Sequence, residues 1–250
     1  MQKIFILGFP HSGTSILKRI IGNAPHVHEH PFETNVVTED MAAAASAAGK
    51  SAIVVKDINF PWMPSYEIPG DTVRVISECK EFLADNTAAR FVMLIKNPSD
   101  IFGSFNRRFP EVPEAARPPG HRFSEWETWA EVFLFFRTAP AANLFPITYE
   151  ELFADDHARL RDLCAFVGVT FGPGLLDSAR QSLIVANVSD VPADEPASRE
   201  NGDDHGKFRT WQINQPIRDM SGESARYLDE ETGQLIARSR VAKRLGYGVG

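Results

Sequence analysis

The chain has 250 residues, of which 43% are hydrophobic and 24% charged, so it can bury a substantial core, and we expect one domain over residues 1–250. A formal net charge of −7 argues against a nucleic-acid-binding protein, so any anion site must be a local basic pocket. No apolar stretch approaches the ~20 residues of a membrane span, and the apolar run after Lys3 is too short for a signal peptide, which predicts a cytoplasmic protein. Cys79 and Cys164 are expected to be reduced core thiols.

Short apolar runs alternate with helical patterns along the chain. We expect strands at 3–7, 51–55, 90–95 and 144–148. We expect helices at 15–21, 41–49, 72–84, 100–108, 123–137, over most of 149–167, and a last one ending near residue 244. The His-rich segment 25–34 is expected to be a loop, the proline-dense segment 110–120 a surface loop, and the polar, acidic segment 183–206 a flexible segment. The alternation predicts an α/β fold with a central parallel sheet flanked by helices, and ligands at the carboxyl ends of the strands.

The first predicted strand runs through a glycine-bounded loop directly into a helix. Gly8 and Gly13 have the spacing of a phosphate-binding P-loop, G-x-x-x-x-G, and Ser15 stands where that motif ends in Ser or Thr. Unpaired N–H groups and the helix dipole favour a phosphate at such a helix start, and the hydroxyls of Ser12, Thr14 and Ser15 add donors. Thr14 replaces the lysine that spans the β- and γ-phosphates in an ATPase. The loop therefore predicts a P-loop-like phosphate site that differs from the triphosphate site of an ATPase.

Residues 8–17, Gly-Phe-Pro-His-Ser-Gly-Thr-Ser-Ile-Leu, resemble the 5′-phosphosulfate loop of the sulfotransferases that depend on PAPS (3′-phosphoadenosine 5′-phosphosulfate, the sulfuryl donor). That family's loop reads Pro, a basic residue, Ser-Gly-Thr, then Ser or Thr. It cradles one phosphate bearing a sulfuryl group, without the spanning lysine and usually without a metal. The resemblance implies that no metal is required and that the donor is bound by Pro10, His11, Ser12, Gly13, Thr14 and Ser15.

A second segment, 96–104, reads Lys-Asn-Pro-Ser-Asp-Ile-Phe-Gly-Ser and resembles the family's 3′-phosphate motif, Arg-x-Pro-x-Asp followed by a spaced serine. The resemblance implies that Lys96 and Ser104 bind the 3′-phosphate. Lys96 keeps the charge of the usual arginine but lacks its bidentate fork, so we expect weaker 3′-phosphate affinity. Arg107 and Arg108 follow one turn later and are expected either near this phosphate or in surface salt bridges.

Two later segments agree with the same family, in the family's order. Residues 148–152, Thr-Tyr-Glu-Glu-Leu, resemble its Tyr-Glu-Asp-Leu element, which implies that Tyr149 packs beside the adenine. Residues 206–211, Gly-Lys-Phe-Arg-Thr-Trp, resemble its late basic loop that closes over the nucleotide, which implies that Lys207 and Arg209 bind the donor. Together the resemblances span the chain from residue 4 to about 211.

Sulfuryl transfer requires in-line placement, stabilisation of the charge on the leaving phosphate, and a base for the acceptor. His11 stands where the family commonly has Lys or Arg. A neighbouring phosphosulfate favours the imidazolium, so His11 is a candidate cation or leaving-group acid. The alternative is a loop histidine with a fixed tautomer and no catalytic role.

Two carboxylates are candidates for the base. Glu33, followed by Thr34, resembles the Glu-Thr pair of tyrosylprotein sulfotransferases, and a partly dry pocket would raise its pKa toward that role. Asp57 is the rival, because it follows the second predicted strand at the active edge of the sheet. The cytosolic branch carries a Lys-Thr-His element in this region, and the matching histidine is missing. The alternating histidines of 26–30 also suggest a zinc site, but such alternation in a proline-flanked loop is more often incidental.

The sequence thus predicts a single sulfotransferase-like domain that moves a sulfuryl group from PAPS to a hydroxyl or amine of a small-molecule, carbohydrate or peptide acceptor. We expect segments 60–70 and 110–123 to line the acceptor pocket. One alternative is a P-loop NTPase or nucleotide kinase, because residues 52–57 resemble a Mg²⁺-binding strand end. Another is a nucleotide-binding regulator without turnover, which the replacements at His11 and Lys96 would suit. The sequence sets no oligomeric state.

Overall fold

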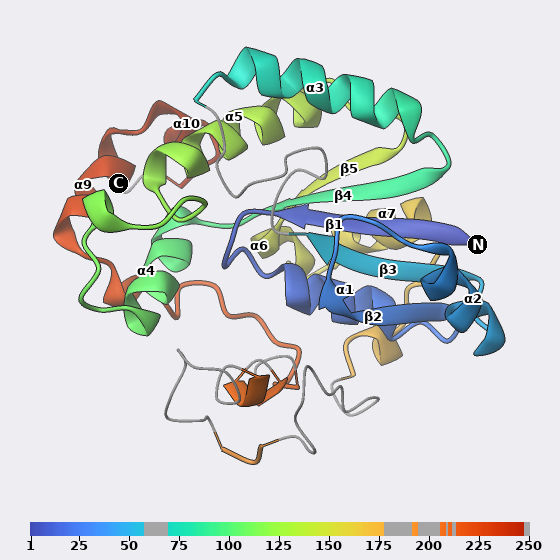
Figure 1. Cartoon of the computed structure of the whole chain (residues 1–250). Coiled ribbons are helices and arrows are strands. Elements are labelled where there is room, and N and C mark those ends of the chain that lie inside the picture. The colour runs from blue at the N-terminus through green and yellow to red at the C-terminus, as the bar shows by residue number, and fades with distance from the viewer. Residues whose placement is uncertain (58–69, 178–191, 195–205, 209, 212–213, 248–250) are drawn as a thin grey trace.

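The computed structural model describes residues 1–57, 70–177, 192–194, 206–208, 210–211 and 214–247. Five strands form one parallel sheet in the order β2-β3-β1-β4-β5 (Figure 1). They are β1 (Gln2–Gly8), β2 (Val27–Glu33), β3 (Ala52–Asp57), β4 (Ala89–Ile95) and β5 (Leu144–Thr148). The α-helices are α1 (Thr14–Gly22), α2 (Glu39–Ala47), α3 (Thr72–Asp85), α4 (Pro98–Arg108), α5 (Phe123–Thr138), α6 (Tyr149–Leu152), α7 (Ala158–Phe166), α9 (Glu230–Arg238) and α10 (Arg240–Arg244).

Side chains alternate across β1 and build a core on each face of the sheet. Ile4 and Ile6 pack with residues of α1 and α7 on one face, while Phe5 and Leu7 pack with residues of α3 and α5 on the other (Figure 1). Because both faces of a central parallel strand are covered, such strands read as continuous apolar runs. The predicted α/β fold with helices on both sides of a parallel sheet is therefore confirmed.

Local sequence signals set the starts of several helices. The Asn97 side chain caps α4 by accepting from the N–H of Ser99, and Pro98 occupies the first helical position. Asp71 caps α3 in the same way by accepting from the N–H of Arg74. Within the ranges that the structure describes, no helix combines the length and apolar character needed to cross a bilayer.

The prediction of a loop at 25–34 is wrong, because most of this segment forms the edge strand β2. Most of its residues are polar, so the sequence lacks the alternation of apolar residues that would predict a strand. Glu29 is buried at 8% exposure, and its carboxylate lies 3.6 Å from the Nζ atom of Lys18 on α1. Burial raises the pKa of Glu29, although Lys18 and Arg19 act in the opposite direction. Lys18 also donates to the carbonyl oxygen of His30, and β2 pairs with β3, so contacts with other elements decide this strand. The expected helix over 149–167 is likewise interrupted between α6 and α7.

Candidate active site

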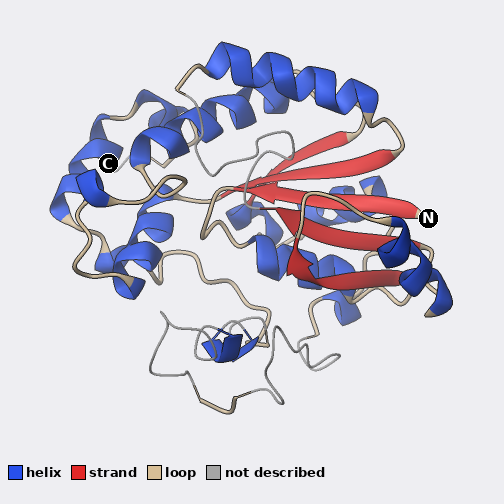
Figure 2. Ribbon diagram, in the orientation of Figure 1, coloured by secondary structure: helices blue, strands red, loops and turns tan. Residues whose placement is uncertain are grey.

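Most of the residues that the sequence singled out stand at one edge of the sheet. All five strands run in the same direction (Figure 2), so β1, β3, β4 and β5 end together at Gly8, Asp57, Ile95 and Thr148. The glycine-bounded loop follows β1, Lys96 follows β4 and Tyr149 follows β5. The carboxyl edge of an open parallel sheet is where such folds bind ligands.

The glycine-bounded loop leads into the start of α1, where no side chain caps the backbone N–H groups. Gly13 is the N-cap of α1 at φ 91°, with no side-chain cap and no acidic residue in the first turn. The side chain of Ser12 is fully buried, and its hydroxyl has no hydrogen-bond partner among the described residues. A buried polar atom without a partner is costly, and an anion at this helix start would supply the acceptor. The geometry therefore fits a phosphate group.

His11 joins the loop to the second predicted motif. Its Nδ1 atom lies 3.2 Å from the Oγ atom of Ser104 on α4, although 93 residues separate them in the chain. The His11 backbone has a φ of 64°, in the left-handed region. Its ring contacts those of Phe105 and His121, with centroids 6.1 and 5.7 Å away. His121 was not predicted as a site residue, since no motif marks it.

Lys96 and Tyr149 lie together beneath the loop. The Nζ atom of Lys96 is 4.2 Å from the centroid of the Tyr149 ring and 3.4 Å from the Oδ2 atom of Asp100. The same ring supports Gly13, because a Cβ atom there would come within 2.5 Å of it. Tyr149 is buried, which raises the pKa of its hydroxyl above the ordinary value. Its ring therefore fixes the loop and Lys96 relative to one another; contact with adenine stays a prediction.

Asp100 ties the start of α4 to a late segment of the chain. Its carboxylate accepts hydrogen bonds from the backbone N–H groups of Gly222 (2.7 Å) and Ser224 (3.1 Å). Gly103 allows this approach, because a Cβ atom on it would overlap the carbonyl oxygen of Ser224. Asp100, the aspartate of the Arg-x-Pro-x-Asp pattern, thus binds the backbone of residues 222–224, a contact that the sequence did not reveal.

The two candidate bases end neighbouring strands. Asp57 ends β3, where it pairs in register with Leu7 of β1. Glu33 ends the edge strand β2, and its Oε1 atom lies 2.7 Å from the Nζ atom of buried Lys56. The Glu33 carboxylate thus has a buried ammonium partner. Among the described residues, no group of three or more His, Cys, Asp or Glu side chains is placed to hold a metal ion.

The family model of the sulfotransferase domain matches residues 1–240. The chain belongs to this sulfotransferase family. The sulfotransferase domain of the Synechococcus PCC 7002 olefin synthase is 20% identical, with a TM-score of 0.52 over 100% of this chain and 96% of that one. Mouse sulfotransferase SULT7A1, complexed with PAP, is 14% identical, with a TM-score of 0.54 over 98% and 87%. At these identities the likeness concerns the fold. No curated protein matches the sequence.

The family resemblance inferred from the motifs is confirmed, and sulfuryl transfer is the general chemistry of the family. The segment 206–211, expected to be a basic loop, is described at 206–208 and 210–211, and those residues are helical. Lys207 is exposed, and the neighbouring Phe208 is buried with its ring 5.1 Å from the guanidinium of Arg108 on α4. This contact brings the late segment of the sulfotransferase to the helix that carries Ser104. Arg209 lies outside the described residues, as do 60–69 of the expected acceptor pocket and most of 183–206.

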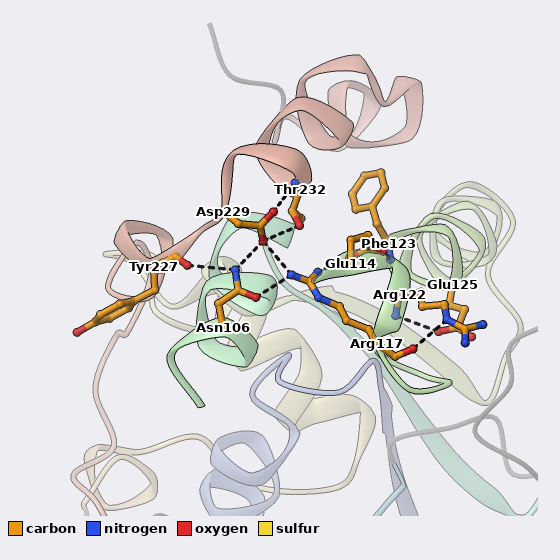
Figure 3. Close-up of polar contacts among 9 residues, drawn as sticks. All are labelled: Asn106, Glu114, Arg117, Arg122, Phe123, Glu125, Tyr227, Asp229 and Thr232. Carbon is orange, nitrogen blue, oxygen red and sulfur yellow. Dashed lines mark hydrogen bonds and ion pairs between the residues drawn. The ribbon is translucent and has the colours of Figure 1, made fainter. Parts of the chain in front are cut away.

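A buried arginine fixes the segment between α4 and α5 of the sulfotransferase (Figure 3). The guanidinium of Arg117 donates to Asn106 Oδ1 at 2.7 Å and to Asp229 Oδ2 at 2.8 Å, and it also pairs with Glu114. Burial would raise the pKa of Asp229, but hydrogen bonds from Thr232 and Asn106, together with the charge of Arg117, lower it to about 2. Segment 110–120, expected to be a surface loop, therefore contains a fully buried cation.

Proposed function

We propose that this sulfotransferase transfers the sulfuryl group of PAPS to a hydroxyl or amine of a small-molecule, carbohydrate or peptide acceptor. The observation that carries the proposal is the 3.2 Å contact between His11 and Ser104, which joins the phosphosulfate-like loop to the 3′-phosphate-like motif. A nucleotide that carries a phosphosulfate and a separate 3′-phosphate would suit two neighbouring anion sites, one at each motif. The proposal includes a single domain over residues 1–250, a cytoplasmic location and no metal requirement.

In this mechanism the residues act on a donor that supplies an activated sulfuryl group. The N–H groups at the start of α1 and the hydroxyl of Ser12 hold the 5′-phosphate, while Lys96 and Ser104 hold the 3′-phosphate. His11 neutralises the charge that develops on the leaving phosphate oxygen as the S–O bond breaks. The loop thus places the sulfuryl group at the carboxyl edge of the sheet, open to in-line attack by an acceptor.

Calorimetric titration of the whole protein tests the donor class. We expect PAP to bind without magnesium, because the proposal places its two phosphates at separate sites and the triphosphate-spanning lysine is absent. A clear preference for Mg·ATP would overturn the proposal in favour of a nucleotide kinase or NTPase. PAP binding without PAP release from PAPS, over a panel of hydroxylated acceptors, would indicate the nucleotide-binding regulator instead.

Replacing His11 tests the cation at the leaving group. We expect His11→Ala to lower kcat by about 100-fold or more, because a positioned acid or cation contributes roughly that much. His11→Lys is expected to retain part of the rate, since it restores a positive charge. The two variants keep a non-glycine residue at the same backbone angle, so they share any conformational strain. Equal rates in both, measured as PAP release, would remove His11 from the mechanism.

A further inference from the structure

His121 is a second imidazole at the candidate active site. It lies just before α5, in the segment expected to line the acceptor pocket, and its ring centroid is 5.7 Å from that of His11 at an interplanar angle of 68°. Its other ring neighbour is Phe105 on α4, at 5.0 Å. The Arg117 cluster fixes the backbone that leads to it, because Arg117 is fully buried and the Nε atom of Arg122 donates to the carbonyl oxygen of Arg117. His121 therefore lies beside the loop, next to a buried and hydrogen-bonded segment.

The hydrogen bonds of His121 assign its tautomer. Its Nδ1 atom lies 3.3 Å from the carbonyl oxygen of Pro119. A carbonyl oxygen only accepts, so Nδ1 carries the proton, and in the neutral ring Nε2 carries the lone pair. Within the described ranges, no residue forms a hydrogen bond with Nε2. This is the state that a histidine needs in order to take up a proton.

The charges around His121 favour the neutral imidazole. Burial lowers its pKa, the hydrogen bond to Pro119 acts in the opposite direction, and the positive charges of Arg108 and Arg117 lower it further. His11 faces it from the loop and is expected to become an imidazolium beside the phosphosulfate. When the surroundings of two imidazoles favour the protonated form of one and the neutral form of the other, the first is suited to act as an acid and the second as a base. The carboxylate of Glu33, by contrast, is engaged by Lys56.

We propose that His121 is the catalytic base that receives the proton of the acceptor. The inference rests on the proposed PAPS-dependent transfer. In the step, the acceptor oxygen forms a bond to sulfur while the bond between sulfur and the 5′-phosphate oxygen breaks. The electron pair of the broken bond stays on that oxygen, beside His11, and the acceptor proton moves to Nε2 of His121. The products are a sulfated acceptor and PAP, and the proton later leaves His121 to solvent.

The test compares two phenols of different acidity in PAP release from PAPS. We expect His121→Ala and His121→Gln to lower kcat with 2-naphthol by about 100-fold or more, while the more acidic 4-nitrophenol, which needs less help to lose its proton, loses far less. The Kd for PAP is expected to stay within about twofold, and added imidazole should restore part of the rate of His121→Ala. A merely structural role would lower both rates equally and would not respond to imidazole.

The pH profile gives a second readout. Since the reaction needs the neutral imidazole, kcat/KM of the wild type should rise through a midpoint below pH 6.5, and this limb should vanish in the His121 variants. NMR of the ring nitrogens should show the proton of the neutral form on Nδ1. A proton on Nε2, a kcat within a few-fold of wild type, or loss of the limb in Glu33→Gln or Asp57→Asn instead would overturn the proposal.

A matched control and the donor titration separate the possible failures. His157 also places its Nδ1 atom near a backbone carbonyl, that of Leu152 at 3.4 Å, and its ring contacts Phe171, but it precedes α7. His157→Ala should leave both phenol rates unchanged. If the wild type binds no PAP, the proposed function fails and the role of His121 fails with it. If PAP binds and turnover survives in the His121 variants, the role of His121 alone is wrong.

Discussion

Replacing Gly13 with alanine is expected to weaken PAP binding by about 100-fold, a loss of roughly 3 kcal/mol of binding free energy. Gly13 has a φ of 91°, where a residue with a Cβ atom costs about 1–2 kcal/mol. The added Cβ atom would also meet the buried ring of Tyr149 at 2.5 Å. Overpacking of this kind costs about 1–3 kcal/mol more, so the free energy of unfolding should fall by roughly 2–5 kcal/mol. Relief of the overlap would displace the helix start on which the phosphate depends.

Gly49→Ala is the matched control for this experiment. Gly49 also has a left-handed backbone, with a φ of 71°, but a Cβ atom there would meet nothing within 4 Å. It should therefore lose only the roughly 1–2 kcal/mol of conformational strain and bind PAP normally. Urea denaturation gives the free energy of unfolding, and calorimetry gives the Kd. Gly13→Ala with the affinity of the wild type would show that Tyr149 does not set the shape of the loop.

Replacing Arg117 with alanine is expected to lower the free energy of unfolding by about 3–5 kcal/mol, the range for removing one partner of a buried ion pair. The variant leaves Glu114 and Asp229 without their shared cation and removes a guanidinium 5.2 Å from the rings of Phe102 and Phe105. Arg117→Met, which keeps the apolar stem, should lose less than Arg117→Ala, and the difference measures packing. Urea denaturation at neutral pH gives the free energies of unfolding of the wild type and of both variants.

The comparison for Arg117 is an exposed arginine in a similar pair. Arg218 forms an ion pair with Glu223, and their side chains are 55% and 41% exposed. Arg218→Ala should change the free energy of unfolding by less than about 1 kcal/mol, because solvent already screens this pair. A loss in Arg117→Ala as small as that in Arg218→Ala would contradict the assignment of Arg117 as the anchor of segment 110–120.

Acid titration tests the same cluster. The folded pKa of Asp229 is about 2, below the ordinary 3.8, so its contribution to stability is present above pH 3.8 and is lost as the pH falls toward 2. Arg117 is one cause of the lowered pKa. The difference in stability between the wild type and Arg117→Ala should therefore narrow over this interval. A constant difference would show that Asp229 does not depend on Arg117.

The sequence by itself determined the elements whose signals are local. The apolar runs predicted β1, β3, β4 and β5 because both of their faces are buried. The spacing of Gly8 and Gly13 predicted the loop, and the structure gives its reason: Gly13 has a positive φ, and both glycines stand where a side chain would collide with the loop or with Tyr149. The family followed from several such local motifs read in order.

The tertiary structure decided what depends on residues far apart in the chain. The edge strand β2 was missed because its polar residues show no apolar alternation, while its pairing with β3 and the contacts of Lys18 with Glu29 and the carbonyl oxygen of His30 come from other parts of the chain. The contact of His11 with Ser104 spans 93 residues, and that of Arg117 with Asp229 spans 112. His121 belongs to no sequence motif, and only its contact with the His11 ring marks it as a candidate site residue. Such contacts exist because the strand order brings separate loops to one edge of the sheet, which no local pattern of residues encodes.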